Sequence, residues 1–317
     1  MFKRHVNWVE FILLWVECGA IRDWFMSKSD QELISLIVVN KGDKGIENTL
    51  RASTKIQDDV QLEIIVVDAS DGSFSWLKDD FPEVRWIDFP AGARGVRTIA
   101  QQRNVGLAAA GGETIIFLDS NCVPEPGWIE SITQPIQSGQ SRIVMGLTRS
   151  LSGSTVHDQV GRRSDVIEFS TTNIAFARSI FDDVGLFDES IGLAEDVDLS
   201  WRVSELGIPI TYNANAVVTH DWGDWKEEFH RAVRYGRGRA RLYRRNPKHW
   251  KQLLRADFNV LAYGVLFVVL IGAIFEPLIL LVALVPLVKN ARSHPFKTVC
   301  YNVAYEFGVI REIASWL

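Results

Sequence analysis

Short apolar runs alternate with helical spacing in the first two thirds of the chain. Leu33–Val39 and Leu62–Val67 are continuous and rich in β-branched residues, which is typical of strands buried on both faces of a parallel sheet. Between them, Gly45–Ile56 has its apolar residues at helical spacing. A further cycle follows, in which Arg97–Ala110 predicts a helix and Glu113–Leu118 predicts a strand. The alternation predicts a doubly wound α/β sheet.

Polar residues stand where the predicted strands end. The three clusters begin at Asn40, Asp68 and Asp119. Because ligands of open α/β sheets bind beyond the carboxyl ends of the strands, we expect these clusters at one rim. No glycine-rich phosphate loop of the G-x-G-x-x-G type follows the first strand, and no P-loop signature occurs in the chain. The candidate phosphate site is therefore acidic.

An acidic site can bind phosphate only with a divalent cation between the like charges. Asp119 and Asn121 offer a carboxylate and an amide oxygen on the turn after one strand. His220, at the end of the later apolar stretch TYNANAVVTH, is a further candidate ligand. Taken singly, an Asp after a strand is commonly a turn residue and a lone His is commonly structural.

A second acidic cluster lies in GLAEDVDLSWRV, residues 192–203. Glu195, Asp196 and Asp198 precede Leu199 and Val203, whose spacing predicts a helix that begins near Asp196. Acids are common at helix N-termini, where they cap free N–H groups and suit the dipole. The cluster alone leaves open whether these acids cap the helix or do chemistry.

Near the other end of the chain, Phe258–Val288 is the longest apolar run, interrupted at Glu276-Pro277 and at Pro286. One helix of that length would be about 46 Å long, well beyond the roughly 30 Å hydrocarbon core of a bilayer. A break at Pro277 predicts an apolar hairpin of two short helices. Lys and Arg flank the run on both sides, so both ends are expected to face the cytoplasm. The alternative is a hairpin buried in a soluble core.

Residues 1–30 contain three tryptophans among aliphatic residues, together with Glu10 and Glu17. The two acids are atypical of a signal peptide or a membrane span. We expect a helix that lies on the membrane surface or packs on the protein. An ordinary amphipathic helix or a misassigned start codon is the alternative. The expected organisation is an N-terminal segment (1–30), an α/β domain (31–245) and a C-terminal membrane-associated helical region (246–317).

Composition narrows the function classes. The chain has 317 residues, of which 47% are hydrophobic and 23% charged, so it is long enough for a full-sized core. A net charge of −5 weighs against a nucleic-acid binder. The three cysteines, Cys18, Cys122 and Cys300, lie far apart and suggest neither a disulfide framework nor a zinc site. A reducing, cytoplasmic setting fits them best.

Three stretches resemble the successive motifs of family 2 glycosyltransferases of the GT-A fold: IIVVDASDGS, GVRTIAQQRNVGLAAAGGETIIFLDSNCVPEPGW and TTNIAFARSIFDDVGLFDESIGLAEDVDLSWRVSELG. The resemblance runs from about Leu33 to Tyr243. The YGRG run at Tyr235–Gly238, the apolar hairpin and YNVAYEFG are similar to membrane-associated members, which build exopolysaccharide or lipid-linked glycans. The resemblance to this family implies a Rossmann-like, mostly parallel sheet flanked by helices, with a C-terminal apolar helical hairpin.

The resemblance implies how the donor would bind. Asp68, with Asn40, would meet the base or ribose of the nucleotide sugar. Ala69 stands where the family often has a second acid, so Asp71 or the main chain would assist. Arg103 matches a basic residue near the nucleotide.

The resemblance also places a metal. Asp119 falls on the first acid of the DXD motif, while Asn121 replaces the second acid. An amide binds a hard cation less tightly than a carboxylate does, which lowers the expected affinity for Mn²⁺ or Mg²⁺.

On the acceptor side, Asp196 falls on the catalytic base of the family. It would take the proton of the acceptor hydroxyl as that hydroxyl attacks the anomeric carbon. Glu195 and Asn173 are expected to contact the acceptor, and Asp198 to orient Arg202. A polar loop from Thr133 to Ser170, with His157 and Arg162-Arg163, is expected near the acceptor. The cations Arg234, Arg237 and Arg239 would either offset the charge of the leaving diphosphate or meet anionic lipid headgroups.

The expected protein is a membrane-associated inverting glycosyltransferase on the cytoplasmic side of the cell membrane. It would move a sugar from a nucleotide-sugar donor to a hydroxyl of a glycan or lipid-linked acceptor, in polysaccharide or glycolipid synthesis. Two alternatives stay open. One is a polyprenyl-phosphate hexosyl transferase, which needs no base because its nucleophile is already anionic. The other is a catalytically inactive, membrane-bound sugar-binding protein.

Overall fold

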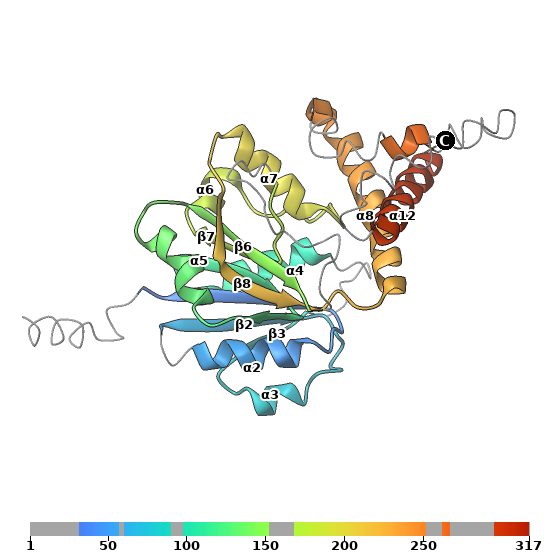
Figure 1. The fold of residues 1–317 in the computed structure, drawn as a ribbon. Helices are drawn as coiled ribbons and strands as arrows, with labels where there is room; N and C mark the ends of the chain where they lie inside the picture. The colour runs from blue at the N-terminus through green and yellow to red at the C-terminus, as the bar shows by residue number, and fades with distance from the viewer. Residues whose placement is uncertain are drawn as a thin grey trace, which may run out of the picture.

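A single eight-stranded sheet forms the centre of the molecule in the computed structural model, which describes residues 32–56, 60–89, 98–151, 168–251, 262–266 and 295–316. Its order is β3-β2-β1-β4-β7-β6-β8-β5 (Figure 1). The strands are β1 (Ile34–Asn40), β2 (Leu62–Asp68), β3 (Arg85–Asp88), β4 (Thr114–Asp119), β5 (Cys122–Pro124), β6 (Ile143–Ser150), β7 (Asn173–Ala177) and β8 (Thr211–His220). The helices are α2 (Ile46–Ile56), α3 (Leu77–Asp80), α4 (Ile99–Ala109), α5 (Trp128–Gln137), α6 (Ile180–Val184), α7 (Glu195–Glu205), α8 (Trp225–Arg245), the 3-10 helix η2 (Pro247–His249) and α12 (Pro295–Ala314).

The sheet has a parallel half and a mixed half. Strands β3, β2, β1 and β4 run parallel, as the apolar runs predict. Beyond β4 the direction changes, because β7 is antiparallel to both β4 and β6, β8 is parallel to β6, and β5 is antiparallel to β8. The expected mostly parallel sheet is therefore confirmed for the first half only. A continuous apolar run indicates burial on both faces and carries no signal of strand direction.

Helices cover both faces of the sheet and enclose two hydrophobic cores. One core packs α2, α3 and α5 against one face, with Leu50, Leu77 and Trp128 fully buried. The other packs α4, α6 and α7 against the opposite face, where Phe117 and Phe176 meet edge to face. In Figure 1, α2 and α3 lie below the sheet and α6 and α7 lie above it. Cores on both faces explain why the strands carry apolar residues at successive positions.

Helix α4 begins and packs as its sequence dictates. Thr98 is its N-cap, and the side chains of Thr98 and Gln101 bond each other's backbone N–H groups in a capping box. Farther along, a Cβ at Gly106 would overlap the side chain of Ile37 in β1. The glycine lets the helix lie close against the sheet, which brings Arg103, one turn earlier, to the sheet rim.

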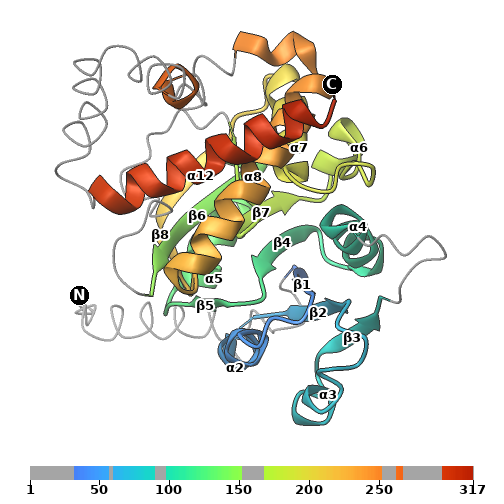
Figure 2. The same ribbon diagram turned by 90° about the vertical axis from the view of Figure 1, so that its right-hand side faces the viewer.

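Helices α8 and α12 lie side by side, apart from the sheet in Figure 1 and in front of it in the view of Figure 2. They approach closely at two glycines: a Cβ at Gly236 would overlap the carbonyl oxygen of Tyr305, and one at Gly308 would overlap that of Val233. Gly236 belongs to YGRG and Gly308 ends YNVAYEFG, so the two motifs of the C-terminal resemblance pack on each other.

Several sequence predictions fall on residues outside the described ranges. They include the segment 1–30, His157 with Arg162-Arg163, and Phe258–Val288, of which only 262–266 are described. Within the described ranges, no helix combines the length and apolar character needed to cross a membrane. The predicted loop from Thr133 to Ser170 is wrong for its first half, because α5 and β6 occupy most of residues 133–150. Scattered polar residues hid the helical and strand periods there.

Candidate active site

The ends of β1 and β2 join two of the predicted donor residues. The parallel register pairs Asn40 with Asp68. Asn40 Nδ2 donates to Asp68 Oδ1 at 3.1 Å, and the hydroxyl of Ser70 donates to Asp68 Oδ2 at 2.7 Å. Both Asn40 and Asp68 are buried, whereas Asp71 is exposed and adopts a left-handed φ of 56° in the following turn. Asn40 and Asp68 thus form one fixed polar unit, and Asp71 lies outside it.

Asp119, at the end of β4, is the next strand-end acid. Thr172 Oγ1 donates to Asp119 Oδ2 at 2.9 Å, and Arg103 Nη2 lies 3.7 Å from Asp119 Oδ1. The Asp119 side chain keeps 31% of its surface exposed, so its carboxylate is held in place and still reaches solvent. A carboxylate with these properties can bind a cation or a polar ligand.

Arg103 links the two halves of the site. Its Nη1 donates to Glu195 Oε1 at the start of α7, and both side chains are buried. The guanidinium also lies over the ring of Phe187, 5.6 Å from the centroid. Glu195 is therefore the buried partner of Arg103, and its contact with the acceptor stays a prediction. Sequence spacing could not show this pairing, because the two residues are 92 positions apart.

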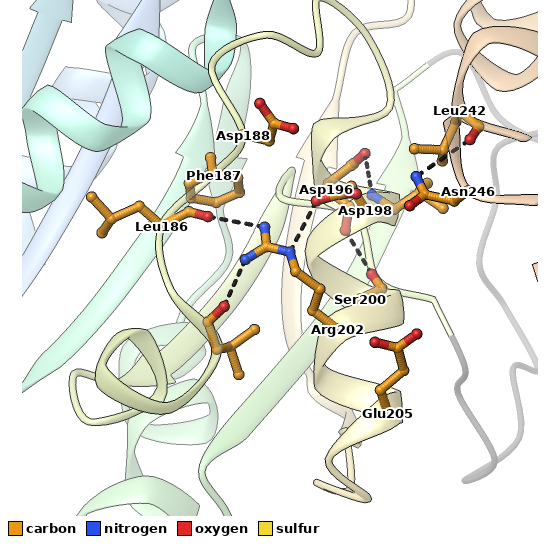
Figure 3. A network of polar contacts seen from close by, with 12 residues as sticks. Leu186, Phe187, Asp188, Asp196, Asp198, Ser200, Arg202, Glu205, Leu242 and Asn246 are labelled. Atoms are coloured by element: carbon orange, nitrogen blue, oxygen red, sulfur yellow. Dashed lines mark hydrogen bonds and ion pairs between the residues drawn. The ribbon is translucent and has the colours of Figure 1, made fainter. Parts of the chain in front are cut away.

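The start of α7 is fixed by tertiary contacts. Its N-cap is Ala194, in a left-handed conformation with φ 68°, and no side chain caps the helix. Asp198 accepts from Arg202 Nε at 3.0 Å, as predicted, and Arg202 also donates to the carbonyls of Val184 and Leu186 (Figure 3). In this turn Glu195 and Asp198 form ion pairs, whereas Asp196 forms none among the described residues. None of the three side chains is the N-cap of the helix.

Asp196 is the carboxylate of this turn that no ion pair engages among the described residues. It is half-buried, and its Oδ1 accepts from the N–H of Val197 at 2.9 Å. Burial raises the pKa of Asp196 to about 7, with a further rise from the charge of Glu195 and an opposing effect from Arg103. A carboxylate with a pKa near neutrality suits proton transfer at physiological pH.

His220 and Asn121 lie on the other side of Asp119. The His220 ring stacks on Trp222, and its Nδ1 is buried without a hydrogen-bond partner among the described residues. Burial lowers the pKa of His220, against the opposing charge of Asp119, so the imidazole is neutral at pH 7. Asn121 Nδ2 donates to the carbonyl of Asp221 at 2.8 Å. This leaves the amide oxygen of Asn121 as its candidate ligand atom.

The donor set around Asp119 is sparse. Within the described parts of the chain, no three His, Cys, Asp or Glu side chains lie together as a complete metal site. A hard cation is commonly held by one or two carboxylates, with substrate phosphates and water at the other positions. Asp119 and the neutral, unpartnered His220 fit such a site, in which the substrate supplies the remaining ligands.

Helix α8 contributes Tyr235, to which sequence analysis gave no role, and two of the arginines that it singled out. Desolvation raises the pKa of Tyr235 to about 12, and the charges of Asp119 and Asp196 contribute to the rise. The phenol therefore stays protonated beside the site. Arg239 is buried and pairs with Glu168 at 2.6 Å, and Arg237 pairs with Glu312 of α12 at 3.0 Å. These two of the three candidate arginines are engaged in ion pairs that join α8 to its neighbours.

Asn173 does not join the cluster. It is buried in the sheet, where it accepts from Trp128 Nε1 at 2.9 Å and donates to the carbonyls of Leu147 and Ala216 at 3.0 Å each. These three bonds hold Asn173 within the sheet, and its contact with the acceptor stays a prediction. The neighbouring Thr172, which bonds Asp119, is the rim residue that the TTN sequence contributes.

Comparison with known proteins identifies the domain. The family model described as glycosyl transferase family 2 matches residues 35–187. Residues 35–187 therefore form a glycosyltransferase family 2 domain. A "Pre-mycofactocin glycosyltransferase" of Mycobacterium tuberculosis is 31% identical over 228 residues, which cover 64% of this chain and 47% of that protein. A "Glucosyl-dolichyl phosphate glucuronosyltransferase" of Haloferax volcanii is 23% identical over 197 residues, which cover 52% and 61%. The chain thus matches about half the length of these relatives.

The family 2 assignment agrees with the fold. The mannosyltransferase PcManGT from Pyrobaculum calidifontis, solved in complex with GDP-Man and Mn²⁺, superposes with a TM-score of 0.68 at 16% identity. The match covers 90% of this chain and 88% of that one. The fold is therefore α/β and GT-A-like, with a mixed sheet and flanking helices.

Proposed function

We propose that the protein is an inverting glycosyltransferase that moves a sugar from a nucleotide-sugar donor to a hydroxyl of a glycan or lipid-linked acceptor. The observation that carries the proposal is the meeting of Asp119, Arg103 and the α7 carboxylates at the rim where β1, β2 and β4 end. The family 2 domain supports the reaction class, and both relatives are named as glycosyltransferases.

In this proposal the donor lies along the strand ends. Asn40 and Asp68 bind the base or ribose of the nucleotide, and the diphosphate extends towards Asp119. The solved mannosyltransferase with GDP-Man and Mn²⁺ supports a nucleotide-sugar donor and a divalent cation. Asp119 and His220, assisted by the amide oxygen of Asn121, would hold the cation, whose charge offsets that of the leaving diphosphate.

Asp196 acts as the base. As the acceptor oxygen forms its bond to the anomeric carbon, the bond from that carbon to the diphosphate oxygen breaks, and the hydroxyl proton passes to the Asp196 carboxylate. Glu195 and Arg103 hold the start of α7 in position for this transfer. The raised pKa of Asp196 favours a hydroxyl acceptor over a lipid phosphate, because an anionic nucleophile has no proton to give up.

The deciding experiment compares Asp196→Asn with Glu205→Gln, a change on the surface of the same helix. A thermal-shift screen of UDP-, GDP- and dTDP-sugars, with and without Mn²⁺, first identifies the donor. We expect Asp196→Asn to keep donor binding and to lose about a hundredfold or more in kcat, while Glu205→Gln stays near wild type. Wild-type activity should rise with pH and level off above about 7.

Other outcomes would assign the alternatives. Near-full activity of Asp196→Asn on a polyprenyl phosphate acceptor would indicate the polyprenyl-phosphate hexosyl transferase. Donor binding without transfer to any acceptor would indicate a sugar-binding protein that has lost catalysis.

We place the protein at the cell membrane, with the catalytic domain on the cytoplasmic side, and its product in polysaccharide or glycolipid synthesis. The apolar run Phe258–Val288 and the basic residues on both sides of it support this location. Membrane fractionation, followed by protease treatment of inverted and right-side-out vesicles, tests it. Protection of the catalytic domain in inverted vesicles would contradict the proposed side.

A further inference from the structure

A separate cavity of about 520 Å³ lies outside the cluster around Asp119 and Asp196. Three segments enclose it: the chain from Ser190 to Leu193, which leads into α7, the last turn of α8, and the end of α12 with Trp316. Figure 2 shows the last turns of α8 and α12 close together near α7. Nothing in the proposed transfer reaction uses this cavity.

The lining of the cavity is strongly basic. Arg241, Arg244 and Arg245 lie on one face of α8, at spacings of three and four residues, and Glu312 is the one acid among the lining residues. Glu312 is already engaged, since it accepts two bonds from Arg241, at 2.6 and 2.9 Å, and one from Arg237 at 3.0 Å. The hydrogen bonds and ion pairs with Arg241 and Arg237 lower the pKa of Glu312 to about 2. The Glu312 carboxylate is therefore charged and already paired with these two arginines.

Arg244 and Arg245 retain unused donors. Neither forms an ion pair within 4 Å among the described residues, although Asp188 feels the charge of Arg245. Arg245 Nη1 donates to Ser190 Oγ at 2.8 Å. The Arg244 guanidinium lies over the Trp316 ring, 4.6 Å from its centroid. A guanidinium that no carboxylate engages keeps N–H donors that can bind phosphate oxygens in pairs.

The remaining surface of the cavity is apolar. Trp316, Ile191, Leu193 and Leu242 line it beside the arginines. An inorganic anion would satisfy the arginines and leave this surface uncovered. A ligand that has a phosphate group at one end and an apolar group at the other would satisfy both.

We propose that this cavity binds a phosphate monoester or diester attached to an apolar group, with Arg244 and Arg245 on the phosphate and Trp316 beside the apolar part. The site does not depend on the proposed transfer, because binding requires neither donor nor Asp196. Leu193 lies two residues before Glu195, and a Cβ at Gly238 of α8 would come within 2.7 Å of the Leu193 Cβ. An occupant of the cavity would thus be in contact with the segment that positions the base.

Titration calorimetry on the full chain tests the proposal with four probes. Hexyl phosphate represents a soluble monoester, dihexanoyl phosphatidylglycerol represents a membrane diester, inorganic phosphate lacks the apolar part, and hexyl glucoside lacks the charge. We expect the two amphiphilic phosphates to bind more tightly than inorganic phosphate and hexyl glucoside not to bind. Tighter binding of hexyl phosphate would indicate a soluble monoester as the ligand, and tighter binding of dihexanoyl phosphatidylglycerol would indicate a membrane lipid.

Variants then distinguish specific binding in the cavity from non-specific attraction of the phosphate to a basic surface. Arg244→Gln combined with Arg245→Gln should weaken hexyl phosphate binding by about tenfold or more, since each removes a charge-assisted hydrogen bond. Trp316→Ala should weaken binding of hexyl phosphate and leave inorganic phosphate unchanged. Arg311→Gln, an exposed change on α12 outside the lining, should leave binding unchanged. Circular dichroism confirms that each variant is folded.

Three results would overturn the proposal. They are equal affinity for hexyl phosphate and inorganic phosphate, an equal loss in Arg311→Gln and in the Arg244/Arg245 double variant, and unchanged binding in that double variant. Each is distinguishable from failure of the proposed transfer, because no sugar donor is present in the measurement.

Discussion

The guanidinium of Arg103 lies between two carboxylates that come from distant parts of the chain. It is 6% exposed, contacts Asp119 at 3.7 Å and bonds Glu195. A buried charge is tolerated when an opposite charge pairs with it. Removing one partner leaves the other charge buried and unpaired, which destabilises the fold. Arg103 therefore determines both the stability of the α4–α7 contact and the charge felt by Asp196.

Replacing Arg103 with Met tests this pairing. We expect Arg103→Met to lower the free energy of unfolding by about 3 kcal/mol, because the Glu195 carboxylate is left buried and unpaired. The double variant with Glu195→Gln should recover part of the loss. Urea denaturation of the four proteins in this cycle gives the coupling energy. Additive effects of the two substitutions would show that the ion pair contributes nothing to stability.

Asp196 has a measurable effect on stability as well as on catalysis. Its pKa is about 7 in the folded protein and lies near 4 in an unfolded chain. The folded state holds the proton more tightly between these values, so the Asp196 contribution to stability falls as pH rises from about 4 to 7. Asp196→Asn removes this titration and should be more stable than wild type above pH 7, by on the order of 4 kcal/mol.

Urea unfolding midpoints at pH 5 and pH 8 test that expectation. The advantage of Asp196→Asn should be small at pH 5 and larger at pH 8. Glu205→Gln serves as the control: its surface ion pair with Lys248 lowers the pKa of Glu205, so its charge is constant across this range. A constant advantage of Asp196→Asn at both pH values would mean that its carboxylate does not titrate between them.

At this scale, the sequence predicted the residues that stand at element ends. Asn40, Asp68, Asp119 and Asp196 can be located because each follows a strand or begins a helix, and topology alone brings such positions to one rim. The partners of Glu195 and Asn173 could not be predicted, since they lie far along the chain and depend on packing of side chains. No local pattern signals those partners.

Helix α7 is the element that presents the candidate base. Its first turn has no side-chain cap, so contacts from neighbouring segments fix its position. Arg202 supplies one such set of contacts, since it bonds Asp198 and the carbonyls of Val184 and Leu186 at the end of α6. These bonds hold the chain segment that carries Phe187 beside Arg103.

Arg202→Lys should disturb this element more than a surface substitution does. A lysine has one ammonium group and cannot bond the carboxylate and both carbonyls as the guanidinium fork does. We expect a loss of about 1–2 kcal/mol in the free energy of unfolding and a lower kcat. The matched control is Arg142→Lys, whose ion pair with Asp183 is exposed and should change stability by less than about 0.5 kcal/mol. Equal effects of the two variants, by thermal unfolding, would contradict the proposed role.

Elements differ in how far the sequence predicts them. The strands β1, β2 and β4 and the helices α2, α4 and α7 appear within a few residues of their predicted positions, because their apolar periods are unbroken. The strands β6 and β7 were missed, since their apolar runs, IVMGL and IAFA, are short. The long helix α8 was hidden by its many arginines, several of which are neutralised by acids on other elements.

For the whole molecule, the contact between α8 and α12 depends on two glycines. Gly308→Ala adds one methyl group against the carbonyl of Val233. We expect overpacking to lower the free energy of unfolding by about 1–3 kcal/mol. Alanine gains about 1 kcal/mol in helix propensity over glycine, so a net loss of stability requires the helices to be in close contact. Thermal unfolding and limited proteolysis of α12 measure the effect. Gly192→Ala is the control, since it meets no atom within 4 Å; a more stable Gly308→Ala variant would show that the helices are farther apart.

The bond between Arg103 and Glu195 has a consequence for synthesis of the protein. During synthesis Arg103 leaves the ribosome exit tunnel well before Glu195 does. In that interval the guanidinium lacks its bond to the Glu195 carboxylate. A fragment that stops before α7 would leave Arg103 with Asp119 as its remaining carboxylate partner among the described residues. Fragment complementation, in which the two pieces are expressed separately, should therefore restore activity only when the later piece includes residue 195.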